Sequence, residues 1–344
     1  MTAPTAAPAE HLDRTLAAMT AAGIDALVLG RSANVRFVSG AEQLAIAGTR
    51  PFAPACVVVR TTGAVHLMST TDVGIPADVP PDRLYGMSWN PMTIMGNVAA
   101  VPGLTDATTV GVDGMTPLME ALLGGVLPGA TLVDGEALLR TVRRPKSPAD
   151  LHGIRRAVDA AETGLAEVAA AAGAGTRECD LLGRFEAALG RLGITTPAFD
   201  AVTCVAGAGL RVLADERPLR TGDLVHLRCG VLVDGWEGGL ARTRVVGPAT
   251  GPQQAAATRA AAALGATVGA CTPGAAIGPL RHGPGVVTLE GVGLGHEELA
   301  DDDHLAVDDV VFVEVLVDQV LLGDTVHVTT TGPVVLSTAP VDLD

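Results

Sequence analysis

The sequence of 344 residues is poor in positive charge. It has a single lysine, Lys146, and 23 basic residues in all against 38 acidic ones, for a formal net charge of -15 at pH 7. Nucleic acids and anionic membranes attract proteins with a positive surface, so this balance argues against either as the main partner. The single lysine, the scarce aromatic residues (2%) and the abundance of alanine and glycine indicate a GC-rich coding bias more than a function.

Cysteine is also sparse. The five cysteines are scattered without C-x-x-C spacing, so neither a disulfide framework nor a thiolate zinc site is indicated. The start, MTAPTAAPAEHLDRTL, lacks the basic region and apolar core of a signal peptide, and no apolar run reaches the roughly 20 residues of a membrane span. We therefore expect a soluble, cytoplasmic protein whose residues 1–8 form a disordered tail.

Hydrophobic patterns predict a first, mixed α/β domain over residues 9–140. Residues 10–23 have the spacing of an amphipathic helix with Leu12, Leu16 and Met19 inward, and 24–30 read as a buried strand. Further strands of this sheet are expected at 55–61, 64–70 and 108–114.

A second domain is expected over residues 141–344, since domains usually run to about 100–200 residues. Ser147 suits a helix N-cap, Pro148 its first turn, and Asp150 adds negative charge near the helix's positive end. A second helix is expected at 179–193 and an alanine-rich one at 253–270. The strands of this domain are expected at 201–205, 224–233, 240–246, 310–317 and 320–329.

The segment 222–247, GDLVHLRCGVLVDGWEGGLARTRVVG, resembles the strand pair of the creatinase, Xaa-Pro aminopeptidase and prolidase family, whose pattern is GDLV, D-x-G, d-G-Y and D-x-x-R-T. Residues 32–40, SANVRFVSG, resemble the family's S-x-N-x-x-Y-x-x-G turn. The resemblance covers nearly the whole chain. It implies an α/β (α+β) fold with a creatinase-like N-terminal domain and a C-terminal pita-bread domain built on a curved antiparallel sheet. It also implies a homodimer.

The same resemblance identifies the positions at which the family's peptidases bind two divalent ions. Those enzymes use two aspartates, one histidine and two glutamates, because hard carboxylate oxygens hold the ions close enough to share an activated water. In this sequence the five positions hold Arg228, Gly239, Val292, Glu314 and Gly323. Arginine presents only hydrogen-bond donors and cannot ligate a metal. The sequence therefore predicts no metal site and no cofactor.

Strand alternation places other polar side chains near this cavity. Residues two apart share a face, so His226 and Arg228 point the same way, and Glu237 lies on the face of Gly239. An ion pair between Arg228 and Glu314 is expected to put a guanidinium where the cations would sit.

Creatinase, a metal-free member that uses a histidine as acid and base on a small guanidino compound, is an informative precedent for function. By analogy we expect a metal-independent enzyme that acts on a small polar molecule by hydrolysis or elimination at a carbon–nitrogen bond. Two histidines are candidates for proton transfer: His296, which matches the family's H-E-x-P motif after a short deletion, and His226. The candidates for substrate binding are Arg228, Glu314, Glu237, Arg242 and Arg211.

Two other interpretations stay open. The chain can be a catalytically inactive relative kept as a binding or partner-interaction module, with Arg228 paired to an acid inside a filled cavity. It can also be a metallopeptidase with shifted ligands. That set would be His226, Asp234, Glu237 and His296, which do not recreate two aspartates at the family's eleven-residue spacing. A histidine within about 4 Å of the Arg228 and Glu314 cavity would favour an enzyme.

Overall fold

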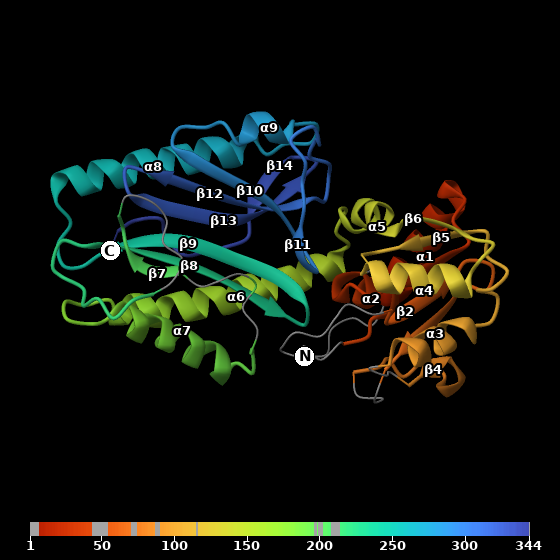
Figure 1. The fold of residues 1–344 in the computed structure, drawn as a ribbon. Coiled ribbons are helices and arrows are strands. Elements are labelled where there is room, and N and C mark those ends of the chain that lie inside the picture. The colour runs from red at the N-terminus through yellow and green to blue at the C-terminus, as the bar shows by residue number, and fades with distance from the viewer. Residues whose placement is uncertain are drawn as a thin grey trace. The chain divides into compact units, whose positions relative to one another are not determined.

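The computed structural model describes residues 7–42, 54–69, 74–86, 90–114, 116–195, 198, 202–207 and 214–343. The chain forms two compact units, Met1–Arg143 and Arg144–Asp344, each with its own sheet (Figure 1). Among the described residues, no helix combines the length and the apolar character that a membrane crossing requires. The tail expected at 1–8 lies outside the described residues up to residue 6, and the first helix begins at Ala7.

The first unit contains a mixed sheet. Its strands are β1 (Ala26–Leu29), β2 (Cys56–Val59), β3 (Ala64–Met68), β4 (Leu84–Tyr85), β5 (Thr109–Val112) and β6 (Thr131–Asp134). They lie in the order β4-β3-β2-β1-β5-β6, with β1 antiparallel to β2 and parallel to β5. The strands expected from the sequence, β1, β2, β3 and β5, are confirmed. The two that were not expected, β4 and β6, lie at the edges of the sheet and bury less apolar surface.

The helices of the first unit are α1 (Ala7–Ala22), α2 (Ser32–Ser39), α3 (Pro91–Ala99), α4 (Pro117–Val126), α5 (Gly135–Arg143) and a short 3-10 helix (Pro81–Arg83). In α1 the expected inward position of Met19 is confirmed, but Leu12 and Leu16 are only half-buried. The buried side of α1 instead includes His11, which stacks on Phe37 with ring centroids 4.1 Å apart.

The segment 32–40, expected to be a turn, is the helix α2, so that prediction was wrong. The backbone N–H groups of Gly30 and Arg31 donate to the carboxylate of Asp113 at 2.7 and 3.1 Å. This carboxylate serves backbone donors just before α2, where the N-cap residue provides no side-chain cap. Gly40 ends the helix in the left-handed conformation, with φ of 69°. Local sequence could not reveal a partner as distant along the chain as Asp113.

The second unit is built on one antiparallel sheet that curves (Figure 1). Its strands are β7 (Val202–Val205), β8 (Leu224–Val233), β9 (Trp236–Val245), β10 (Val286–Gly293), β11 (Gly295–Glu297), β12 (Val310–Val317), β13 (Val320–Thr329) and β14 (Gly332–Val335). The order is β11-β10-β12-β13-β9-β8-β7, with β14 paired to β13. The five expected strands are confirmed. Strands β10 and β11 were not expected, because the sequence around them is rich in glycine.

Helices cover one face of this sheet. They are α6 (Pro148–Ala171), α7 (Glu178–Arg191), α8 (Gly251–Ala270) and the short α9 (Ile277–Leu280). Helices α6 and α7 pack on β8, while α8 packs on β12 and β13 (Figure 1). Helix α6 begins with a capping box, in which the Ser147 hydroxyl accepts from the Asp150 N–H and the Asp150 carboxylate accepts from the Ser147 N–H.

Strand alternation separates the two faces of the sheet. Leu227, Cys229 and Val231 of β8 are fully buried in the helix-covered core. All five cysteines are free. Residues between them, Arg228 among them, face the other side. The expected α/β architecture is therefore confirmed. The polar side chains that the family resemblance singled out lie on the face of the second sheet opposite these helices, the open face.

Candidate functional site

Four strands bring Arg228 and Glu314 into one row across the open face. Arg228 pairs with Ala241, Ala241 with Gly323, and Gly323 with Glu314. Directly opposed residues in antiparallel strands share a face. Gly239 lies two residues from Ala241 on the same face. The register therefore gathers the positions that the family resemblance singled out on β8, β9, β12 and β13.

The expected ion pair between Arg228 and Glu314 is present. Arg228 Nε donates to Glu314 Oε2 at 2.7 Å, and the side chains are 14% and 6% exposed. A guanidinium nitrogen also lies 3.8 Å from Glu290, and the guanidinium carbon stands 5.4 Å from the centre of the Phe312 ring. Burial raises the pKa of Glu314, and Arg228 opposes that rise by stabilising the charged form. Arg228 is thus an internal cation that lies against the carboxylates of Glu314 and Glu290 and the ring of Phe312.

These residues do not fit a pair of divalent metal ions. The single carboxylate in the ligand positions, Glu314, is bound to the guanidinium of Arg228, which occupies a second of these positions, and the other three carry glycine or valine. Within the part of the chain that the structure describes, no group of three or more His, Cys, Asp or Glu side chains is arranged to hold a metal ion.

The alternative set of metal ligands, to which His226, Asp234 and Glu237 belong, is not brought together either. His226 pairs with Thr243, six residues along β9 from Glu237, which corresponds to about 20 Å of extended strand. Asp234 lies in the turn between β8 and β9 and is half exposed, paired with Arg156 at 2.6 Å. One ion cannot reach both ends of this strand.

Glu237 is the least ordinary group on the open face. It is 6% exposed, and its Oε2 has no hydrogen-bond partner among the described residues. Burial raises its pKa to about 8, the charges of Glu290 and Glu297 add to the rise, and Arg228 opposes it. At neutral pH Glu237 is therefore mostly a neutral carboxylic acid, which can donate a proton as well as accept a hydrogen bond.

A second buried ion pair, missed in the sequence, lies beside Glu237. Lys146 Nζ donates to Glu297 Oε2 at 2.9 Å, with side chains only 1% and 4% exposed. A Cβ on Gly293 would stand 2.0 Å from Glu297 Oε1. A side chain at position 293 would therefore displace the buried carboxylate from this place. The unusual glycine density of GVGLG was the signal available in the sequence.

The two candidate histidines occupy different places. His226 is 1% exposed and its Nε2 donates to the Gln319 carbonyl at 2.8 Å, while burial lowers its pKa, so the ring is neutral. It lies on the side of Arg228 away from Glu237. The backbone of His296 pairs with Val292 in β11, a strand that contacts β9, on which Glu237 lies. The side chain of His296 is outside what the structure describes.

Arg242, one of the two remaining arginine candidates, is not brought to this face. Arg242 is 3% exposed on the helix-covered side, where it binds Asp324 at 2.9 Å and four backbone carbonyls. Its contacts tie β9, β13 and the C-terminal segment together. Arg211 lies outside the described residues. The structure thus brings together Arg228, Glu314 and Glu237, but neither His226 nor Arg242 with Glu237.

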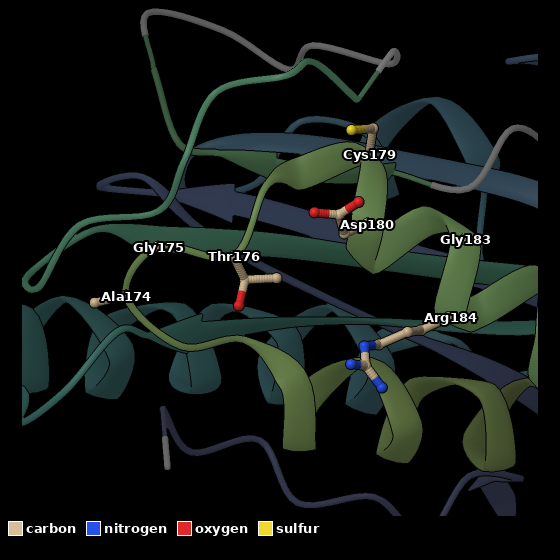
Figure 2. A pocket seen from close by; sticks show the side chains of 7 residues that line it. All are labelled: Ala174, Gly175, Thr176, Cys179, Asp180, Gly183 and Arg184. Atoms are coloured by element: carbon tan, nitrogen blue, oxygen red, sulfur yellow. The ribbon is translucent and has the colours of Figure 1, made fainter.

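A different hollow lies at the start of α7 (Figure 2). Thr176, Cys179 and Asp180 are among the side chains around it. Asp180 is exposed and paired with Arg177 at 2.7 Å, and Cys179 is half-buried. Among the described residues, none of the buried polar atoms that lack a hydrogen-bond partner belongs to this hollow.

Breaking the ion pair from one side should destabilise the protein. We expect Arg228→Met to lower the free energy of unfolding by about 3 kcal/mol, because Glu314 would stay buried without its cation. Arg228→Met combined with Glu314→Leu should lie within about 1 kcal/mol of the wild type. Urea unfolding measures both. The exposed pair Arg259–Asp318 is the matched control, for which Arg259→Met should cost less than about 1 kcal/mol. Equal losses in the single and double variants would contradict this account.

The raised pKa of Glu237 predicts a pH dependence of stability. In the unfolded chain the carboxyl ionises near its ordinary pKa of 4.5, but in the folded protein near 8. Between these values the unfolded state gives up the proton first, so rising pH favours unfolding by up to about 1.4 kcal/mol per pH unit. Glu237→Gln cannot titrate. Its stability relative to the wild type should therefore rise from pH 5 to 8 in urea unfolding. Parallel pH curves for the two proteins would refute the buried-acid assignment.

Comparisons with known protein families agree with the fold of the two units. A model of metallopeptidase family M24 matches residues 152–282, and a model of the creatinase/prolidase N-terminal domain matches residues 11–144. No curated protein matches the chain.

Solved structures share the fold over nearly their full length. The prolidase from Pyrococcus horikoshii OT3 has 19% identity and a TM-score of 0.80, covering 97% of this chain and 100% of its own. The Xaa-Pro dipeptidase from Bacillus anthracis has 18% identity and a TM-score of 0.77, covering 98% and 99%. The X-Pro aminopeptidase from Thermotoga maritima MSB8 has 14% identity and a TM-score of 0.78, covering 96% and 98%. At these identities the likeness establishes the fold. With one family model on each unit and this fold throughout, the chain belongs to the creatinase/prolidase family, metallopeptidase family M24.

Proposed function

We propose that this protein is a metal-independent, creatinase-like enzyme that acts on a small polar molecule by hydrolysis or elimination at a carbon–nitrogen bond. One observation carries the proposal. Glu237 holds a carboxyl group in a buried position with an unpartnered oxygen, at a pKa of about 8, on the open face that holds Arg228 and Glu314. A proton donor tuned close to neutral pH is what breaking a carbon–nitrogen bond needs.

The surrounding charges indicate a substrate with a positively charged or polar nitrogen group. Glu290 is the most accessible carboxylate of the cluster, with 36% of its side chain exposed, and lies 3.8 Å from Arg228. Arg228 is already engaged by Glu314, so a substrate carboxylate would compete with protein carboxylates for it. The sequence made Arg228 a candidate for substrate binding. The contacts favour Glu237 and Glu290 as the first partners of the substrate, with Arg228 holding the cluster in place.

Glu237 and His296 divide the proton transfers in this proposal. As the carbon–nitrogen bond breaks, the departing nitrogen takes the bonding electron pair and a proton from neutral Glu237. In hydrolysis, His296 accepts the proton that the attacking water loses as its oxygen bonds to carbon. In elimination, His296 accepts a proton from the neighbouring carbon, whose electron pair forms the new double bond. His226, neutral and hydrogen-bonded to the Gln319 carbonyl, takes no part.

A second candidate function is a binding module without chemistry. It is favoured by the Arg228–Glu314 ion pair, since the site balances its own charges as the interior of an inactive relative would. In that case the same face binds small nitrogenous molecules, and Glu237 contributes a hydrogen bond only.

Variants of the two proton-transfer residues separate these candidates. Chelator-treated protein is screened against guanidino acids, ureido acids, amidines and N-acyl amino acids, with product and bound ligand both measured. If the protein is an enzyme, Glu237→Gln and His296→Gln should each lower kcat/KM by at least about 100-fold, while circular dichroism stays unchanged. The exposed His304 provides the matched control, and His304→Gln should keep full activity.

Saturable binding without turnover would establish the binding module instead of the enzyme. Turnover that survives Glu237→Gln and His296→Gln would contradict the assignment of the proton carriers. A chain that neither binds nor converts any of the four compound classes would refute the proposal.

A further inference from the structure

A second pocket lies on the helix-covered face of the sheet, opposite to the face of Arg228. Its volume is about 370 Å³. Leu165, Ala166 and Ala169 of α6 and Leu227 of β8 form an apolar wall, and the C-terminal segment from Thr338 to Asp342 forms the other. Because Leu227 and Arg228 are neighbours on β8, their side chains point to opposite faces. This pocket is therefore separate from the site around Glu237.

The pocket is empty of side chains because small residues of α6 face a C-terminal segment that is held in place. Ala166 and Ala169, nearly one helical turn apart, present only methyl groups where longer side chains would fill the space. On the other side, the carboxylate of Glu162 accepts from the Thr338 and Ala339 N–H groups and from the Thr338 hydroxyl. Arg242 donates to the carbonyls of Ala339 and Pro340 at 2.7 and 2.8 Å. The C-terminal segment is thus held in place by polar contacts that leave the apolar wall uncovered.

Arg244 gives the pocket a positive charge. It lines the pocket and is half-buried, and no hydrogen bond or ion pair joins its side chain to any of the residues that the structure describes. The other charged groups around the pocket differ from it. Arg242 and Glu162 are committed to the C-terminal segment, and Asp342 is exposed. The pocket therefore combines an apolar wall with one cationic group available to a ligand.

We propose that this pocket binds a small amphiphilic anion, with its carboxylate on Arg244 and its hydrocarbon chain along α6 and Leu227. Guanidinium and carboxylate form strong charge-assisted hydrogen bonds, and the apolar wall removes the hydrocarbon chain from water. The volume is in the range of small-molecule sites. The ligand class is a medium-chain or aromatic carboxylate, and the site is independent of the reaction proposed at Glu237.

Octanoate is the probe for this site, with octanol and octylammonium as its neutral and cationic analogues. Titration calorimetry should give one saturable site for octanoate, with affinity at least tenfold higher than for either analogue. Arg244→Gln should weaken octanoate binding about tenfold and leave octanol binding unchanged. Ala166→Leu, at an exposed helical position, should fill the pocket and abolish binding of both, and Ala166→Met serves as a second filling variant.

The exposed Arg259 of α8 is the matched control, and Arg259→Gln should not change octanoate affinity. Urea unfolding of each variant verifies that the fold is retained. Three results would each overturn the proposal: octanoate binding that does not saturate, octanoate binding unaffected by Arg244→Gln, or binding that survives both pocket-filling variants in folded protein.

Discussion

The open face of the second sheet depends on the ion pair between Arg228 and Glu314. The two residues lie on β8 and β12, which are separated by β9 and β13, so the pair spans the middle of the sheet. Each charge would be costly to bury alone, and together they neutralise each other at 2.7 Å. We propose that Arg228 supplies, from within the chain, the positive charge that bound metal ions would otherwise bring to these positions. The register of four strands keeps it there.

This internal cation also sets the chemistry of its neighbours. A single guanidinium faces Glu314 and Glu290 and acts on Glu237 from a distance. Glu297 is neutralised separately by Lys146, the only lysine of the chain. One cation cannot balance every remaining carboxylate, so the most buried unpartnered one, Glu237, keeps its proton. The site, like the whole sequence, thus has fewer positive than negative groups. This imbalance keeps Glu237 a neutral acid near neutral pH.

Predictions from the sequence were most successful where a local pattern or a fixed residue spacing determines the structure. Long apolar strands, the Ser147 cap and the Arg228–Glu314 pair were all predicted, because strand alternation and the family motif fix those positions. The helix α2 was not, since its capping carboxylate, Asp113, comes from a distant strand end. The Lys146–Glu297 pair and the protonated state of Glu237 also escaped prediction. Burial and the sum of nearby charges are properties of the folded chain and cannot be read from residue spacing.

We propose that the Arg228 guanidinium takes the place of metal ions at this site. Metal content tests it most directly, measured by plasma mass spectrometry on protein purified without chelator, before and after incubation with manganese, cobalt or zinc and desalting. The account predicts far less than one equivalent of any of these metals per chain, and no rise after incubation. Two metal ions per chain retained after desalting would contradict it, and would return metal-dependent peptidase chemistry to this fold.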